Sequence, residues 1–351
     1  MVKVMTHSSL DPPPPALRAR SVTQLIGVVP ALLGFHPTES LVAIAVHGPR
    51  QRLGFRLRID LPDLEHAAPA AEQVATHLVR QQPDGVILVA FAQSAATADV
   101  LIEQIIERLD QAAVDVAEAV RCDGNRFWSY VCDRRDCCPP GGRPYESDSN
   151  TLLAEAIYRG VEVLPDRQAL VDRFASTAGS RREAMLEATG SAHAKLQLAA
   201  RGSANPQRDA DLVRAGLDKV LGIVDGCRAG RVITDEQVAT LSVLATLVVV
   251  RDVLWARITR ENAAEQLALW RDVAVRTVSP FEPAMFSLAA FAAWLSGDGS
   301  QAQCALDRAA QADPDYSMAA LLQSALSGGL SPQAWEGLDD GEILRTVPGL
   351  T

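Results

Sequence analysis

The feature that most constrains the fold of this chain is a change of pattern close to residues 139–144, where prolines and glycines cluster. Before this segment, short apolar runs alternate with amphipathic stretches, as strands and helices do around an α/β sheet. After it, apolar residues recur with helical spacing, and no convincing strand is predicted. The sequence therefore predicts an α/β domain, with a mixed sheet and flanking helices, followed by an all-α domain.

The chain has 351 residues, enough for about two domains. Its start contains four consecutive prolines and lacks the apolar core of a signal peptide. The predicted segments are a disordered lead-in (residues 1–19), the α/β domain (20–165), the helical domain (166–335) and a C-terminal tail (336–351).

Within the α/β domain, residues 53–60 alternate cleanly, with Leu53, Phe55, Leu57 and Ile59 on one face. Residues 123–125, Asp-Gly-Asn, are typical of a tight turn, and they are predicted to connect two strands as a second hairpin. The predicted order is a helix capped by Ser21 and ended by Gly34 (21–33), a hairpin (40–46 and 53–60), a helix (70–81), a strand (85–92), a helix capped by Ser94 (95–111) and the second hairpin (114–121 and 126–132).

The helical half begins with a helix capped by Asn150 (150–158) and another over residues 165–174, and amphipathic helices follow over residues 181–326. Breaks are predicted at 202–206 and 226–234, while the apolar run 239–250 is predicted as one buried helix, too short to span a bilayer. One tetratricopeptide-like repeat fits the spacing of Phe286, Ala290, Ala302, Leu306, Ala309 and Pro314, and a plain helical bundle explains the same pattern.

Composition excludes several classes of function. The formal net charge of −10 argues against general affinity for nucleic acid or anionic membranes. No phosphate loop, dinucleotide-binding glycine motif, His-Glu-x-x-His or Gly-x-Ser-x-Gly motif is present. We expect a cytoplasmic protein with reduced thiols, without binding to nucleic acid or membranes.

The segment from Phe127 to Cys138 combines three aromatic residues with three of the six cysteines. Cys122 would lie beside the hairpin turn, roughly 15 Å or more from Cys132 at the far end of the strand, so we exclude it from a joint site. Three interpretations stay open for Cys132, Cys137 and Cys138. They are reduced thiols packed in a tight turn, a disulfide or redox pair, or a metal site completed by a residue such as His36.

Other candidates have polar side chains in or beside the predicted strands. Trp128, Tyr130 and Cys132 occupy alternate positions and are predicted to share one strand face, either as core or as a ligand platform. The other four candidates lie close to the first hairpin. His36 and Glu39 are close enough in a loop to cooperate as acid and base, whereas Arg58 and Asp60 would bind an anion or pair on a solvated face.

A resemblance covers most of the chain, from about residue 20 to 335. The residues that carry it are Leu32-Leu33-Gly34-Phe35-His36-Pro37, Arg58-Ile59-Asp60-Leu61-Pro62, and Trp128-Ser129-Tyr130 with Cys132 and Cys137-Cys138-Pro139. In this combination the sequence resembles the actinobacterial family catalogued as domain of unknown function 4192. The resemblance implies a cytoplasmic bacterial protein. It also strengthens His36 and the cysteines as candidate functional residues, because they belong to the pattern that carries it. It implies no activity, substrate or cofactor.

The sequence favours a binding or regulatory protein. Its α/β domain would hold a small-ligand pocket or a switch near residues 128–138, and its helical domain would dock an unidentified protein partner. No cofactor is expected, with zinc at Cys132, Cys137 and Cys138 as an alternative. Two other functions stay open: a hydrolase or transferase with a Cys132 or Cys137 nucleophile, His36 as base and Arg58 as anion clamp, or a thiol redox sensor.

Overall fold

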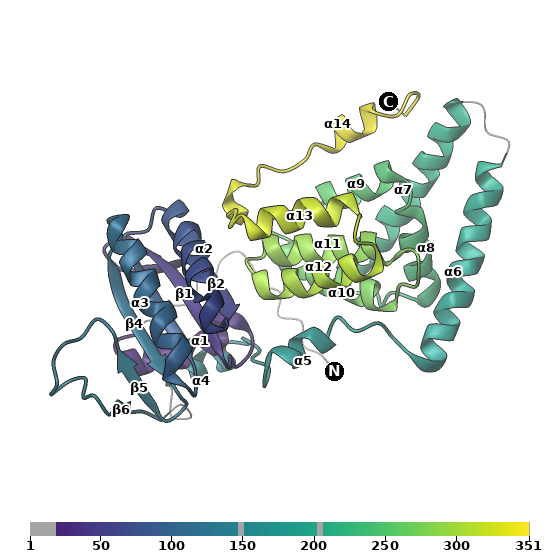
Figure 1. The fold of residues 1–351 in the computed structure, drawn as a ribbon. Helices are drawn as coiled ribbons and strands as arrows, with labels where there is room; N and C mark the ends of the chain where they lie inside the picture. The colour runs from purple at the N-terminus through teal and green to yellow at the C-terminus, as the bar shows by residue number, and fades with distance from the viewer. Residues whose placement is uncertain (1–18, 147–150, 202–205, 351) are drawn as a thin grey trace. The chain divides into compact units, whose positions relative to one another are not determined.

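The computed structural model describes residues 19–146, 151–201 and 206–350. The predicted lead-in falls outside these ranges except for its last residue, and so do the predicted helix cap Asn150 and most of the predicted break at 202–206. The chain divides into two compact units, the first ending at Leu164 and the second beginning at Pro165 (Figure 1).

The first unit is built on a mixed six-stranded sheet with the strand order β2-β1-β3-β4-β5-β6. All neighbouring strands are antiparallel except β3 and β4, which run parallel and are connected through a helix. The mixed sheet that the alternating pattern predicted is confirmed. The strands are β1 (Ser40–His47), β2 (Arg52–Asp60), β3 (Gly85–Phe91), β4 (Val116–Cys122), β5 (Arg126–Ser129) and β6 (Arg143–Pro144).

Helices of the first unit agree closely with the sequence pattern. The first begins after Ser21, whose side chain caps Gln24 N, and ends at Gly34 with φ of 79°. Ser94 caps the helix between β3 and β4, which has the predicted bounds. The helices are α1 (Val22–Leu33), α2 (Ala67–Arg80), α3 (Ala95–Gln111) and α4 (Thr151–Tyr158), with a short 3-10 turn at Leu64–His66.

The core of this unit forms where α2 and α3 cover one face of the sheet (Figure 1). Alternate residues of β1, including Leu41 and Ala43, belong to this core, as do Leu88 of β3 and Leu101 of α3. β1 is buried on both faces, which explains its continuous apolar run. Edge strand β2 is half exposed. Phe55, Leu57 and Ile59 of its predicted apolar face pack against the same core, whereas Leu53 is exposed.

The second unit contains only helices among its described residues. The all-helical prediction is therefore confirmed, whereas the tetratricopeptide-like repeat stays a prediction. The helices are α5 (Arg167–Asp172), α6 (Gly179–Ala200), α7 (Pro206–Arg228), α8 (Asp235–Leu244), α9 (Val248–Ala256), α10 (Ala263–Arg276), α11 (Glu282–Leu295), α12 (Gly299–Ala312), α13 (Ser317–Ser327) and α14 (Asp340–Arg345), with a 3-10 turn at Pro332–Ala334.

One prediction for this half needs correction. The run 239–250 is not one buried helix, because the chain bends by 110° between α8 and α9. Ser242 and Thr246 donate hydroxyl hydrogen bonds to preceding carbonyls here, and such local bonds compete with a continuous helix. The predicted tail, residues 336–351, contains α14, with Asp339 as its N-cap.

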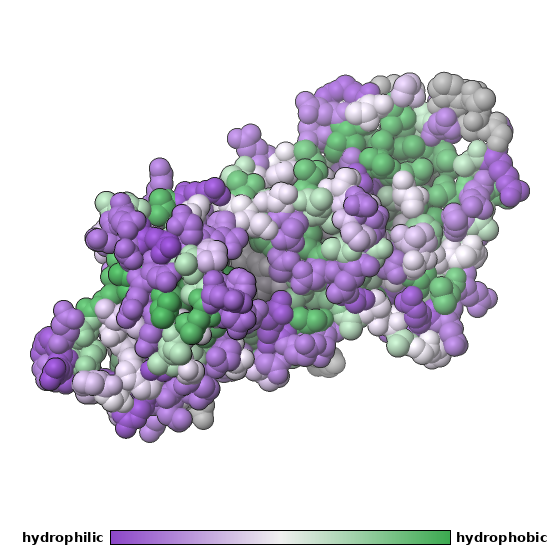
Figure 2. Space-filling model, viewed as in Figure 1, coloured by the Kyte–Doolittle hydropathy of each residue, from purple (hydrophilic) through white to green (hydrophobic). Residues whose placement is uncertain are grey.

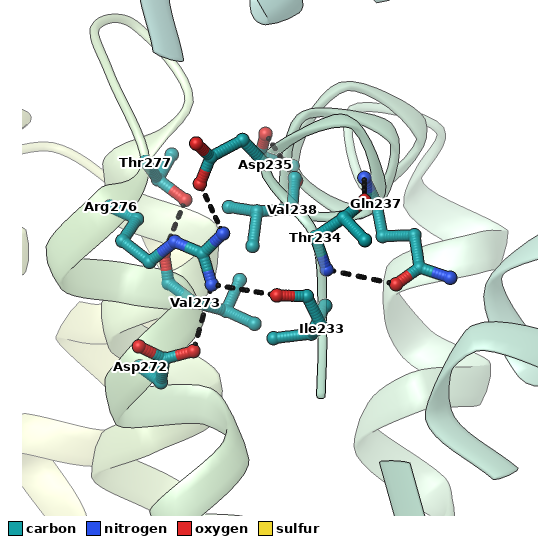
Figure 3. Close-up of polar contacts among 10 residues, drawn as sticks. Ile233, Thr234, Asp235, Gln237, Val238, Asp272, Val273, Arg276 and Thr277 are labelled. Atoms are coloured by element: carbon teal, nitrogen blue, oxygen red, sulfur yellow. Dashed lines mark hydrogen bonds and ion pairs between the residues drawn. The ribbon is translucent and has the colours of Figure 1, made fainter. Parts of the chain in front are cut away.

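A buried arginine joins two helices of this unit (Figure 3). The Arg276 side chain, 3% exposed, donates to Ile233 O at 3.2 Å and pairs with Asp272 at 2.9 Å and with Asp235. Asp235 opens α8, and Thr234 and Gln237 form a capping box beside it. Arg276 at the end of α10 therefore fixes the start of α8.

No single helix among the described residues is long and apolar enough to cross a membrane. The bent pair α8 and α9 passes the same test of length and composition when taken together.

Candidate functional site

Three thiols come together after β5. The Sγ atoms of Cys132, Cys137 and Cys138 all lie within 4.8 Å of one another, and the three residues are half-buried with free thiols. The described part of the chain offers no fourth cysteine, histidine or carboxylate inside this cluster. The fold therefore brings Cys132 next to the vicinal pair Cys137 and Cys138.

A tight turn creates this approach. The backbone N–H groups of Cys137 and Cys138 both donate to the carbonyl of Arg134, at 3.0 and 2.6 Å. The Arg134 guanidinium pairs with Asp136 at 2.7 Å across the turn. The turn folds the vicinal cysteines back onto Cys132, which lies beyond the end of β5.

Trp128 holds this loop against the sheet. Its indole Nε1 donates to the carbonyl of Pro140 at 3.2 Å, and its ring edge lies against Gly142. A Cβ atom on Gly142 would come within 2.5 Å of the ring, so only glycine fits this contact. Arg126 adds two hydrogen bonds, to the carbonyls of Gly141 and Gly142 at 3.1 and 2.8 Å.

Behind Trp128 lies a buried cation that the sequence analysis missed. The Arg121 guanidinium carbon is 3.8 Å from the Trp128 ring centroid, and its Nε is 3.3 Å from Asp99 Oδ1. The Tyr130 hydroxyl donates to the same carboxylate. Burial, followed by the contact with Asp99, raises the pKa of Tyr130. The signal available in the sequence was the arginine at the end of the predicted strand 114–121, directly after Ala119 and Val120.

Trp128 in β5 and Tyr130, the first residue after it, both contact the Arg121–Asp99 pair, so these two side chains lie on the same side as predicted. The prediction is wrong for Cys132. β5 ends at Ser129, so the alternation of side chains along a strand does not extend to this residue. The chain leaves the ladder there to begin the turn toward the vicinal cysteines.

The thiols differ in acidity. A backbone hydrogen bond from Arg134, followed by thiol contacts from Cys138 and Cys137, lowers the pKa of Cys132. Burial, followed by contacts with the other two sulfurs, raises the pKa of Cys138 to about 12. Arg143 Nη1 approaches the Cys137 sulfur at 3.9 Å. Cys132 therefore ionises before Cys138, and a cation stands beside the cluster.

His36 lies at the opposite end of the sheet from the thiols. His36 precedes Ser40 at the start of β1. Ser40 pairs with Phe91 of β3, and Phe91 pairs with Cys122 of β4, so all three lie at the same end of the sheet. β5 runs back from that end, so Cys132 follows its far end. Three strand spacings, about 14 Å, also separate β1 from β5. The interpretations in which His36 assists a thiol as base or completes a metal site are therefore wrong.

The remaining candidates make structural contacts. Glu39, with φ of 41°, accepts a hydrogen bond from Gln93 N at 3.0 Å. Arg58 donates to Ser40 Oγ at 2.6 Å and pairs with Asp60 at 2.5 Å, and its side chain is 12% exposed. Arg58 is therefore engaged with its neighbours, and the interpretation as paired residues holds.

Cys122 stands apart, as the hairpin argument predicted. It is 1% exposed, and its thiol donates to Ala90 O at 3.4 Å. Burial raises its pKa to about 12. Cys304 is also buried and Cys227 is half-buried, and both belong to the helical unit.

Comparison with known proteins gives a family and no activity. No curated protein and no solved structure matches the chain. One family model matches residues 23–333, which include both the thiol cluster and most of the helical unit. The chain therefore belongs to the family described as "Domain of unknown function (DUF4192)".

Proposed function

We propose that this protein is a non-enzymatic binding or regulatory protein whose α/β unit binds one soft divalent cation, zinc, through Cys132, Cys137 and Cys138. The approach of the three sulfurs to within 4.8 Å carries the proposal. Tetrahedral zinc with Zn–S bonds of about 2.3 Å holds its sulfurs about 3.8 Å apart. Small side-chain rotations therefore suffice to bind the ion.

The chemistry of the site favours zinc over hard cations. Thiolates select zinc and other soft metals, whereas magnesium and calcium prefer oxygen ligands. Three thiolates around Zn²⁺ carry a net charge of −1, which the nearby Arg143 guanidinium offsets. With no fourth ligand among the described residues of the cluster, the fourth position would accept water or a donor from a bound molecule.

The regulatory role follows from how the loop is attached. Residues 132–142 reach the sheet mainly through Trp128 and Arg126. Metal binding would fix the turn at Arg134 and hold the carbonyls of Pro140 and Gly142 in place. The metal would thus couple the order of an exposed loop to the Trp128–Arg121 contact.

Zinc titration of the purified full chain, followed by native mass spectrometry under reducing conditions, tests the proposal. We expect one zinc ion per wild-type chain, and weaker binding by about 100-fold or more in Cys132→Ser and Cys138→Ser. Cys227→Ser, a half-buried cysteine of the helical unit, is the matched control and should bind as the wild type does.

Two outcomes would contradict the metal site. The first is a wild-type chain that binds no zinc, and the second is unchanged binding in Cys138→Ser. Loss of two hydrogens on mild oxidation, abolished in Cys132→Ser and without zinc binding, would identify a thiol redox sensor in its place.

The helical unit is proposed to dock a protein partner. Figure 2 shows apolar side chains at the surface of this unit, and its exposed large apolar residues include Leu198 at 69% and Val248 at 56%. The cytoplasmic location and the lack of binding to nucleic acid or membranes, expected from the charge of −10, stay predictions.

A further inference from the structure

The helical unit contains a cavity of about 370 Å³ between α7, α9, α10 and the start of α14. Its walls include Leu221, Val224 and Leu254, and residues 338–340 lie across one side. This volume is within the range of small-molecule sites. The cavity lies wholly in the second unit, so it is independent of the thiol cluster.

Two buried polar side chains line this cavity, and one of them lacks a hydrogen-bond partner. Trp270 is fully buried, and its indole Nε1 has no hydrogen-bond acceptor. Gln266 is 3% exposed and lines the same cavity. The two residues are one turn apart on α10 and therefore share a helix face. Buried polar groups in folded proteins are nearly always paired, so a ligand in this cavity would supply the acceptor that the Trp270 N–H lacks.

The charged residues at the cavity argue against an anionic ligand. Arg257 is paired with Asp340 at 2.9 Å, and Arg228 lies 4.0 Å from Glu265. Asp225 and Asp339 add negative charge to the lining. A phosphate or carboxylate ligand would therefore be repelled by the carboxylates, and the arginines that could attract it are already paired with Asp340 and Glu265.

We propose that this cavity binds a small uncharged heterocycle with a cyclic amide, of nucleobase size. The Gln266 carboxamide would pair with the adjacent N–H and C=O of the lactam, because it both donates and accepts. The Trp270 N–H would donate to a ring oxygen or nitrogen, and Leu221, Val224 and Leu254 would contact the ring.

Isothermal titration of the full chain with hypoxanthine, uracil and 2-pyridone tests the proposal. We expect one of these probes to bind with 1:1 stoichiometry. Gln266→Leu and Trp270→Phe should each weaken binding by about tenfold, the effect of losing one buried hydrogen bond. Trp255→Phe is the matched control, because its Nε1 is also unpaired but the residue does not line the cavity. Its affinity should equal that of the wild type.

A second measurement does not depend on the stability of the variants. The chain has five tryptophans, so indole ¹⁵N labelling gives five Nε1–H signals. Bound ligand should move the Trp270 signal most. The proposal is overturned if none of the three probes binds at about 1 mM, if binding is unaffected by both cavity substitutions, or if the Trp270 signal stays in place during binding.

Discussion

The guanidinium carbon of Arg121 lies 3.8 Å from the centroid of the Trp128 ring. Arg121 is 6% exposed, and Asp99 is the carboxylate that balances its charge. Trp128 also donates a hydrogen bond to the carbonyl of Pro140, and its ring packs against Gly142. One side chain therefore connects a buried cation of the sheet with the loop that carries the three thiols.

Replacing Trp128 by leucine removes both the ring over Arg121 and the bond to Pro140. We expect the free energy of unfolding of the α/β unit to fall by about 2 kcal/mol. Trp128→Phe keeps a ring over Arg121 and should lose about 1 kcal/mol, the contribution of one hydrogen bond. Urea unfolding followed by circular dichroism measures both. Equal stability of Trp128→Leu and wild type would show that the loop is not held by this residue.

Gly142→Ala tests the contact between the loop and Trp128. Gly142 has φ of 75°, and the new Cβ would approach the indole to 2.5 Å. We expect a loss of stability of about 2 kcal/mol and weaker zinc binding.

The neighbouring Gly141→Ala is its control, because no atom lies within 4 Å of the Cβ position there. It should change stability by less than about 0.5 kcal/mol. If the two variants behave alike in thermal unfolding and in zinc titration, the close packing of Gly142 on Trp128 has no role.

Arg276→Met removes the buried guanidinium shown in Figure 3. Asp235 and Asp272 would lose their cation, and Ile233 O would lose its donor. Because both carboxylates are partly exposed and can be hydrated, we expect a loss of about 2–3 kcal/mol for the helical unit. Arg260→Met, at an exposed position, should stay within about 0.5 kcal/mol of wild type. Chemical denaturation compares them, and similar values for both would refute the structural role of Arg276.

Glu118 makes the stability of the α/β unit depend on pH. Burial raises its pKa, although hydrogen bonds from Ala119 N and Ser129 Oγ oppose the shift. The folded state holds this proton more tightly than the unfolded state does. Its contribution to stability is therefore fully present at a pH below the pKa of the unfolded state, and it is lost as the pH rises through the pKa of the folded state.

Glu118→Gln keeps the acceptor oxygen and removes the buried charge. It should therefore be more stable than wild type at pH 7, and the difference should shrink at pH 4. Unfolding free energies at both pH values measure this, with the exposed Glu103→Gln as control. A variant less stable than wild type at pH 7 would contradict the assignment.

Most of the α/β unit could be predicted from local pattern. The apolar run of β1, the alternation of β2 and the Ser94 cap of α3 each follow from short-range chemistry, and the structure agrees. The bend between α8 and α9 could not, because residues 239–250 contain no charged residue, proline or glycine to mark a break. Tertiary packing decides where such a run breaks.

The candidate site divides in the same way. The sequence by itself determined that Cys132, Cys137 and Cys138 are close along the chain, and that Cys122 lies at the opposite end of the strand. Only the tertiary structure decided that His36 is far from them, because strand order and direction are set by long-range pairing. The same holds for Arg121 beneath Trp128, and for Gln266 and Trp270 in a shared cavity. Such relationships join segments that no local pattern connects, since burial between elements is a property of the whole fold.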